Sequence, residues 1–135
     1  MSASVRFVAG LLVIGAGAAP VSFAVMRWQA KAEAQTTAEQ LTRGGVERGK
    51  LVIGAYGCGS CHVIPGITTA NGQVGPSLKS VAVRVQIAGK LANSPEAMTH
   101  WLRSPQTVVP GNGMPNQGLN EQEARDAAAY LYTLK

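Results

Sequence analysis

The chain has 135 residues, of which 46% are hydrophobic and 14% charged, and its formal net charge is +5. This length accommodates one small domain and an appendage, since domains commonly contain about 100–150 residues. A nucleic-acid-binding protein usually carries a clustered basic stripe, so this mild positive excess does not indicate nucleic acid as a partner. The charge is compatible with docking to an acidic protein surface or with ordinary solubility, and both interpretations stay open.

An uncharged segment, residues 7–26, lies between two arginines near the amino terminus. About 20 helical residues, rising ~1.5 Å each, cross the ~30 Å hydrocarbon core of a bilayer, so the segment is predicted to be a transmembrane helix or a signal sequence. It is longer than the ~7–15-residue apolar core of a signal peptide, and Trp28 is typical of an interfacial anchor, which favours a retained anchor over residues 1–28. The small-residue string at residues 32–34 keeps cleavage open as the alternative.

Residues 29–43 contain mainly Ala, Gln, Thr, Glu and Lys, and we interpret them as a tether with no packed core of its own. A globular domain is predicted over residues 44–135. The apolar spacing in residues 46–56 predicts a helix of about three turns. Gly49 and Gly54 each weaken that helix by up to ~1 kcal/mol relative to Ala, so their presence indicates that another helix crosses it closely.

The string Cys58-x-x-Cys61-His62 follows this helix and contains both cysteines of the chain. Two thiols at this spacing can add across the two vinyl groups of one porphyrin, and the next residue then brings an imidazole to the iron, so the string is a c-type haem attachment signal. Three alternatives compete with it. A disulfide between Cys58 and Cys61 would close only a tiny loop, a thioredoxin-like redox pair needs a βαβ setting, and a zinc site needs further Cys or His ligands, of which only His100 exists.

Two later helices are predicted from their capping residues. A short helix begins at Ser94-Pro95, with Ser as the N-cap and Pro in the first turn, and ends before Pro105. The pair Asn120 and Glu123 predicts the capped start of a last, alanine-rich helix that carries a buried apolar stripe.

The remaining segments are expected to be irregular. Residues 65–76 and 105–118 are rich in turn-forming residues and are predicted to be loops. Residues 81–87 alternate between apolar and polar but have no evident partner strand, so no strand pair is expected.

Together, the Cys-x-x-Cys-His string, a Gly-Pro-x-Leu segment around Pro76, a Trp-bearing middle helix, a late Met-Pro pair and an Ala- and Tyr-containing last helix resemble a class I cytochrome c over about residues 46–135. The resemblance implies an all-α, class I cytochrome c fold behind a single N-terminal transmembrane helix. It also implies one covalently bound haem c, with thioethers at Cys58 and Cys61 and with His62 as the proximal iron ligand. The carbonyl of Pro76 would accept a hydrogen bond from the far nitrogen of this imidazole and fix its orientation.

Within this resemblance, the sixth iron ligand is chosen among Met114, Met98 and His100. Met114 is favoured because the glycines and prolines around it allow the backbone to approach a flat cofactor. Met98 on the middle helix is interpreted as core packing and His100 as a surface or propionate-side residue. A thioether ligand raises the reduction potential relative to two imidazoles. Trp101 is expected to pack at the haem edge, with a plain core aromatic as the alternative.

Three basic residues are weaker candidates for the same site. Arg84, Lys90 and Arg103 are candidate counter-charges for the haem propionates or docking charges for a partner, and simple solvation is the alternative for each.

The resemblance implies a periplasm-facing electron-transfer protein that is not itself an enzyme, although it can be a subunit of a larger oxidoreductase. Its partners would be respiratory-chain proteins, a quinol-oxidising complex or dehydrogenase on one side and a terminal oxidase or reductase on the other. Because haem c is attached outside the cytoplasm, residues 7–26 would anchor it in the cytoplasmic (inner) membrane with the haem domain in the periplasm. A haem-based ligand sensor and a mainly structural subunit of a respiratory complex are the alternatives.

Overall fold

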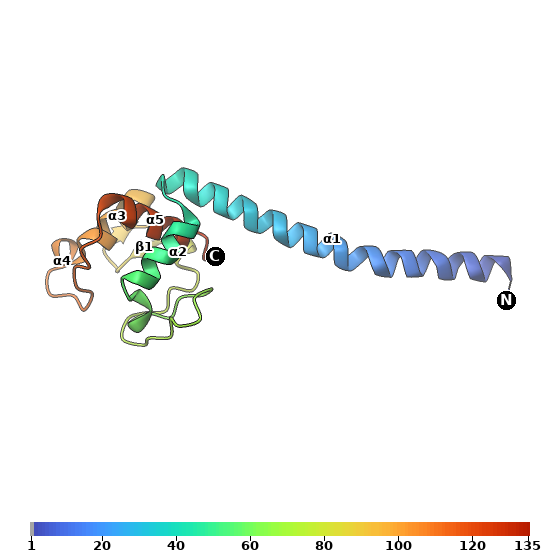
Figure 1. Cartoon of the computed structure of the whole chain (residues 1–135), viewed down its shortest axis with the longest axis horizontal. Coiled ribbons are helices and arrows are strands. Elements are labelled where there is room, and N and C mark those ends of the chain that lie inside the picture. Colours follow the sequence, from blue (N-terminus) through green and yellow to red (C-terminus); the bar gives the residue numbers. More distant parts are fainter. Residues whose placement is uncertain (1) are drawn as a thin grey trace. The chain divides into compact units, whose positions relative to one another are not determined.

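A computed structural model describes residues 2–135, apart from the side chains of residues 13 and 14. The regular secondary structure of the described residues is almost entirely helical (Figure 1). The helices and 3₁₀ turns are α1 (Ala3–Thr42), α2 (Val46–Ala55), η1 (Cys58–Ser60), η2 (Val81–Val83), α3 (Pro95–Arg103), α4 (Pro105–Val108) and α5 (Glu121–Tyr132). The expected all-α architecture is confirmed. The chain divides into two compact units, Met1–Glu33 and Ala34–Lys135.

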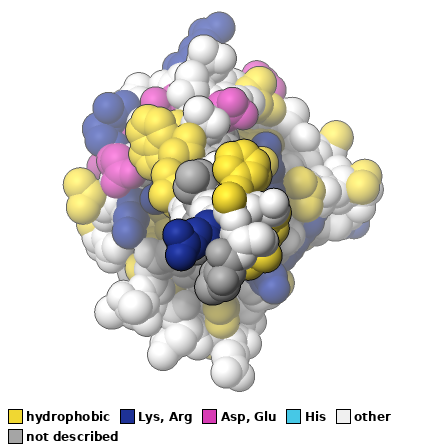
Figure 2. Space-filling view, turned by 90° about the vertical axis from the view of Figure 1, so that its right-hand side faces the viewer, with side chains coloured by type: hydrophobic (Ala, Val, Ile, Leu, Met, Phe, Trp, Pro, Cys, Tyr) yellow, Lys and Arg dark blue, Asp and Glu magenta, His cyan; other side chains and the backbone are white. Residues whose placement is uncertain are grey.

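The first unit is the greater part of α1, and its large apolar side chains are exposed. Phe7 and Trp28, for example, are 69% and 71% exposed. The view from the end at which α1 begins shows hydrophobic side chains on the surface (Figure 2). By length and composition this helix can cross a membrane. Pro20 lies inside it, where a ring without an N–H removes one helical hydrogen bond.

The last turns of α1 belong to the second unit and contribute to its core. Ala38 and Thr42 are 2% and 5% exposed, and the Thr42 hydroxyl donates to the carbonyl of Ala38 at 2.7 Å. The Glu39 carboxylate accepts a hydrogen bond from the backbone N–H of Val46 at 2.9 Å, across the turn into α2. This packing was not expected for residues 29–43, because it uses small side chains rather than the large apolar ones that indicate a core in a sequence.

Helices α2 and α5 cross at a point where α2 has a glycine. A Cβ at Gly49 would overlap the carbonyl oxygen of Asp126 and lie 3.1 Å from the Cβ of Tyr130, so only glycine permits this approach. The predicted close crossing is thus confirmed at Gly49. It is wrong at Gly54, where a Cβ would meet open space.

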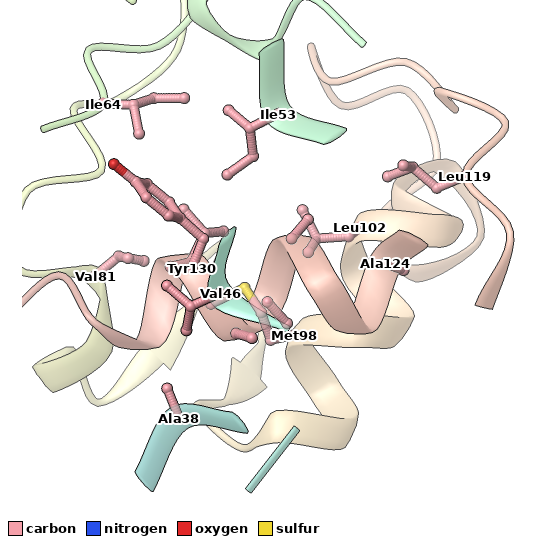
Figure 3. Close-up of a cluster of buried hydrophobic side chains, with 14 of the residues drawn as sticks. Ala38, Val46, Ile53, Ile64, Val81, Met98, Leu102, Leu119, Ala124 and Tyr130 are labelled. Carbon is pink, nitrogen blue, oxygen red and sulfur yellow. The ribbon is translucent and has the colours of Figure 1, made fainter. Parts of the chain in front are cut away.

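The core of the second unit lies between α2, α3 and α5 (Figure 3). Ile53 of α2, Met98 and Leu102 of α3, and Tyr130 of α5 are all buried in it. Ala124 and Ala128 of α5 are fully buried, and Ala127 and Leu131 are 2% and 3% exposed, which confirms the predicted stripe on this helix.

The predicted caps are also confirmed. Ser94 accepts a hydrogen bond from the N–H of Ala97 at 3.1 Å, with Pro95 as the first residue of α3. Asn120 and Glu123 form a reciprocal capping box at the start of α5, with bonds of 2.8 and 2.9 Å.

Two expectations of irregular structure need correction. Residues Gln86–Ile87 (β1) and Leu91–Ala92 (β2) form a short antiparallel pair. The turn between the two strands has positive φ at Ala88 and Gly89. The sequence did not predict this pair, because strands of two residues are too short to give a recognisable pattern. The segment 105–118 begins with the four-residue helix α4, for which Pro105 fits the first turn.

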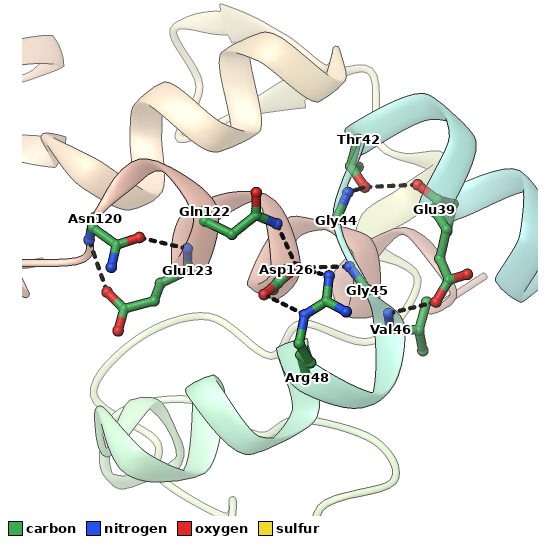
Figure 4. Close-up of polar contacts among 11 residues, drawn as sticks. Glu39, Thr42, Gly44, Gly45, Val46, Arg48, Asn120, Gln122, Glu123 and Asp126 are labelled. Carbon is green, nitrogen blue, oxygen red and sulfur yellow. Dashed lines mark hydrogen bonds and ion pairs between the residues drawn. The ribbon is translucent and has the colours of Figure 1, made fainter.

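A buried carboxylate fixes the start of α2 against α5 (Figure 4). Asp126 is 4% exposed and accepts hydrogen bonds from the N–H of Gly45 at 2.7 Å, from Gln122 at 2.9 Å and from the Arg48 guanidinium at 3.0 Å. Burial raises the pKa of Asp126, but these hydrogen bonds lower it, and the net shift is downward. The carboxylate therefore remains ionised in the folded protein.

Candidate cofactor site

The Cys58-x-x-Cys61-His62 string follows directly from the end of α2. Gly57 adopts a left-handed conformation with φ of 64°, which ends the helix and begins the 3₁₀ turn η1. The backbone N–H of His62 donates to the carbonyl of Cys58 at 3.0 Å. Cys58 and Cys61 are free thiols, each half-buried, so the turn presents two separate nucleophiles rather than a disulfide. Burial raises the pKa of the Cys58 thiol; a backbone hydrogen bond opposes this shift, and the neighbouring Cys61 adds a smaller increase.

This turn forms part of the wall of a cavity of about 640 Å³ in the second unit. The volume lies within the range of small-molecule and cofactor sites, about 300–1,000 Å³. Most of the wall is apolar, with Ile53, Ile64, Leu78 and Leu131 among the lining side chains. The six residues predicted to bind the cofactor all line this cavity: Cys58, Cys61, His62, Pro76, Trp101 and Met114.

The orientation of His62 is set by two neighbouring residues of the Gly-Pro segment. Nδ1 of the imidazole lies 2.7 Å from the carbonyl oxygen of Pro76. Because a carbonyl only accepts, Nδ1 carries the proton in this contact, which in the neutral ring leaves Nε2 as the nitrogen with the lone pair. Gly75 lies against the ring, since a Cβ there would come within 2.7 Å of Nδ1. The hydrogen bond expected between the His62 imidazole and the Pro76 carbonyl is therefore present.

Of the other three candidate ligands, two line the cavity and one does not. Met114 is half-buried in the loop between α4 and α5 and lines the cavity, as does the fully buried Met98 of α3. His100 does not line it. That side chain lies instead in a second hollow of about 390 Å³, together with Arg103.

Among the basic candidates, only Arg84 lines the large cavity. Its guanidinium donates to the carbonyl of Ser77 and, at 3.0 Å, to the carbonyl of Lys79. It thereby braces the segment that follows Pro76.

Two residues of this site were not predicted from the sequence, Gln106 and Asn112. Their side-chain amides bind backbone groups of the loop that carries Met114. Amide side chains in a loop have no periodicity that would set them apart, and no signal in the sequence distinguishes them from solvated residues.

The alternatives to haem find little support in this geometry. A thioredoxin-like pair needs a βαβ unit, whereas the strands in the described residues are the two-residue β1 and β2. Within residues 2–135, no group of three or more His, Cys, Asp or Glu side chains is placed to hold a metal ion, and a structural zinc site needs four such ligands. The apolar cavity beside two thiols and an imidazole fits a planar haem.

Two curated relatives are similar to this chain. Cytochrome c oxidase subunit 2 of Alkalihalophilus pseudofirmus strain OF4 is 34% identical over 98 residues, which cover 72% of this chain and 28% of the relative. Cytochrome c oxidase subunit 2 of Bacillus sp. strain PS3 is 33% identical over 82 residues, which cover 58% of this chain and 23% of the relative. The chain thus spans about a quarter of the length of these relatives. No solved structure matches it.

The family model for cytochrome c matches residues 46–135, which include the whole Cys-x-x-Cys-His string, the Gly-Pro segment and the methionine loop. The fold agrees, with α2, α3 and α5 around the cavity and one N-terminal helix long and apolar enough to span a membrane. The chain therefore belongs to the cytochrome c family, with the class I fold.

Proposed function

We propose that this chain is a membrane-anchored, monohaem electron-transfer protein of a respiratory chain. The observation that carries the proposal is that the Cys58-x-x-Cys61-His62 string and Met114 line the same apolar cavity. When bound there, haem c supplies reversible one-electron exchange at its iron. The residues of the chain hold it, set its ligands and exclude water.

Cys58 and Cys61 are proposed as the attachment points. Each thiol would add across one vinyl group, its sulfur bonding to one carbon and its proton going to the other, so that no oxidant would be required. The half-buried position of both thiols on one short turn supports this role.

His62 is proposed as the proximal ligand through Nε2. The Pro76 carbonyl accepts the Nδ1 proton, which selects this tautomer and makes the imidazole a stronger donor to a metal. Gly75 leaves room for the ring to lie in this orientation.

Met114 is proposed as the sixth ligand. A thioether is neutral and soft, so it stabilises the reduced state and raises the potential relative to a second imidazole. With His62 and Met114 both holding the iron, the site would have no open position for a substrate, which favours electron transfer over catalysis or gas sensing. Trp101 is proposed to pack at the haem edge, and Arg84 to face a propionate.

Residues 7–26 are proposed to anchor the chain in the cytoplasmic membrane, with the haem domain in the periplasm. Electrons would pass from a quinol-oxidising complex or dehydrogenase to a terminal oxidase or reductase. The names of the two relatives, both subunits of cytochrome c oxidase, support an oxidase as the acceptor.

The test uses the full chain, purified in mild detergent, as wild type, Met114→Ala and Met98→Leu. Met98→Leu is the matched control, because it removes the other thioether of the cavity at nearly constant volume. We expect the wild type and Met98→Leu to be oxidised and reduced reversibly without binding carbon monoxide, and Met114→Ala to bind it and to have a lower potential. Ready binding of carbon monoxide by the reduced wild type at neutral pH would refute the electron carrier and favour the sensor. An oxidase that co-purifies would support the proposed acceptor.

A further inference from the structure

The segment between α4 and α5 is fixed by side chains rather than by secondary structure. Residues 109–120 form no helix or strand, yet Met114 within them is half-buried at the cavity. A loop of this length would leave a side chain mobile unless other groups restrained its backbone. Two amide side chains supply that restraint.

Gln106, on α4, reaches into the loop and uses all its hydrogen-bonding groups. Its Nε2 donates to the carbonyl of Asn112 at 2.8 Å and to the carbonyl of Met114 at 2.7 Å. Its Oε1 accepts from the N–H of Gly111 at 3.1 Å. Because a primary amide has two N–H donors, this arrangement satisfies both of them on loop carbonyls.

Asn112 completes the arrangement from within the loop. Its Oδ1 accepts from the N–H of Met114 at 2.7 Å, and its Nδ2 donates to the carbonyls of Pro105 and Val109 at 2.9 and 2.6 Å. Both polar backbone groups of Met114, the N–H and the C=O, are therefore bound by side-chain amides. The direction of the two bonds from Gln106 Nε2 is fixed, since the carbonyls of Asn112 and Met114 can only accept.

We propose that Gln106 and Asn112 are positioning residues that hold the Met114 thioether at the depth required to bind iron. This inference rests on the proposed role of Met114 as the sixth ligand. Neither amide needs to touch the iron. They act by keeping the Met114 backbone in one place, so that a weak neutral ligand stays bound without paying the entropy of ordering the loop each time.

The direction of the bonds provides a sharp test. Gln106→Glu preserves the size of the side chain and the acceptor for Gly111, but an ionised carboxylate is acceptor-only and would face the carbonyls of Asn112 and Met114. Gln106→Ala removes the bonds without adding repulsion. Thr107→Ala, an exposed change on the same helix, is the matched control.

The measurement is the charge-transfer absorption band that reports a sulfur–iron bond in the oxidised holoprotein, together with carbon monoxide binding in the reduced state. Far-UV circular dichroism and covalent haem content verify that each variant has folded. We expect Thr107→Ala to retain the band, Gln106→Ala to weaken it, and Gln106→Glu to lose it and to bind carbon monoxide. Gln106→Ala decides the question should Gln106→Glu fail to fold, because full retention of the band by the alanine variant would overturn the proposal.

Met114→Ala separates this inference from the proposed function. If Met114→Ala loses the band while both Gln106 variants keep it, Met114 is the ligand and the positioning role is refuted. If Met114→Ala keeps the band, the assignment of Met114 itself fails, and the role of the two amides fails with it.

Discussion

Gly75 lies directly against the imidazole of His62, and a Cβ at this position would come within 2.7 Å of Nδ1 and closer still to Cε1. The same imidazole is bound through Nδ1 to the carbonyl of the next residue, Pro76, at 2.7 Å. One dipeptide therefore both orients the ring and leaves the space that the ring occupies. Glycine is required here by contact with a side chain, since Gly75 has no positive φ.

Gly75→Ala should displace the His62 ring and break its bond to Pro76. Partners of a ligating imidazole typically contribute about 10–100-fold to metal affinity or activity, and we expect an electron-transfer rate reduced by a factor in that range. The measurement is the reduction potential and the rate of reduction of the holoprotein. The control is Gln73→Ala, an exposed change two residues away. Equal potentials and rates for Gly75→Ala and the wild type would contradict the contact.

The haem string shows how much could be predicted from the sequence. Its chemistry depends on residues next to one another, so the spacing of Cys58, Cys61 and His62 predicts a site without knowledge of the fold. Met114 could be proposed as a ligand because its glycine- and proline-rich surroundings are also local. Gln106 could not be proposed in this way, since its role depends on backbone groups several residues away that only the folded loop brings together.

The elements were predictable to a similar extent. The types and spacing of Asn120 and Glu123 predict the capping box, and the structure contains it. The burial of Ala38 was missed because an alanine in a polar helix does not show which face meets a neighbour. Gly49 and Gly54 look alike in sequence, but only the crossing of α2 and α5 shows that one is packed and the other is exposed.

Gly49→Ala and Gly54→Ala should have opposite effects on stability. At Gly49 a methyl group would overlap the carbonyl oxygen of Asp126, so we expect a loss of roughly 1–3 kcal/mol in the free energy of unfolding. At Gly54 a methyl group meets no atom, and the better helix propensity of alanine should add up to about 1 kcal/mol. Urea unfolding monitored by circular dichroism measures both. Equal destabilisation by the two variants would contradict this expectation. It would show that a side chain at position 54 meets a contact that outweighs the better helix propensity of alanine.

Asp126 should make the stability of the second unit depend on pH in the acidic range. Its folded-state pKa is lowered below the unfolded value of about 3.9, because hydrogen bonds from Arg48, Gly45 and Gln122 outweigh the opposing effect of burial. The folded state therefore binds the proton less readily than the unfolded state. This contribution is fully present above the unfolded pKa and is lost as the pH falls through the folded pKa.

Asp126→Asn tests this contribution, because the amide retains one acceptor for Gly45 but carries no charge to attract Arg48. We expect the variant to be less stable than the wild type at neutral pH, with the difference shrinking as the pH falls below about 4. Urea unfolding at a series of pH values measures the difference. A difference independent of pH would indicate that geometry and not ionisation is what the carboxylate contributes.

The side chain of Asn120, the N-cap of α5, should contribute measurably to the stability of the protein. Asn120 accepts from the N–H of Glu123 at 2.9 Å, and its own N–H donates to the Glu123 carboxylate at 2.8 Å. Asn120→Ala removes the side-chain acceptor and should cost about 1 kcal/mol, whereas Asn120→Gly should cost only a few tenths, since glycine lets water reach the free backbone N–H groups. Thermal and urea unfolding of the two variants compare them directly. Because α5 carries the fully buried alanines of the core, a loss confined to fraying of its first turn, without a change in global unfolding, would mean that the cap is not coupled to the packing behind it.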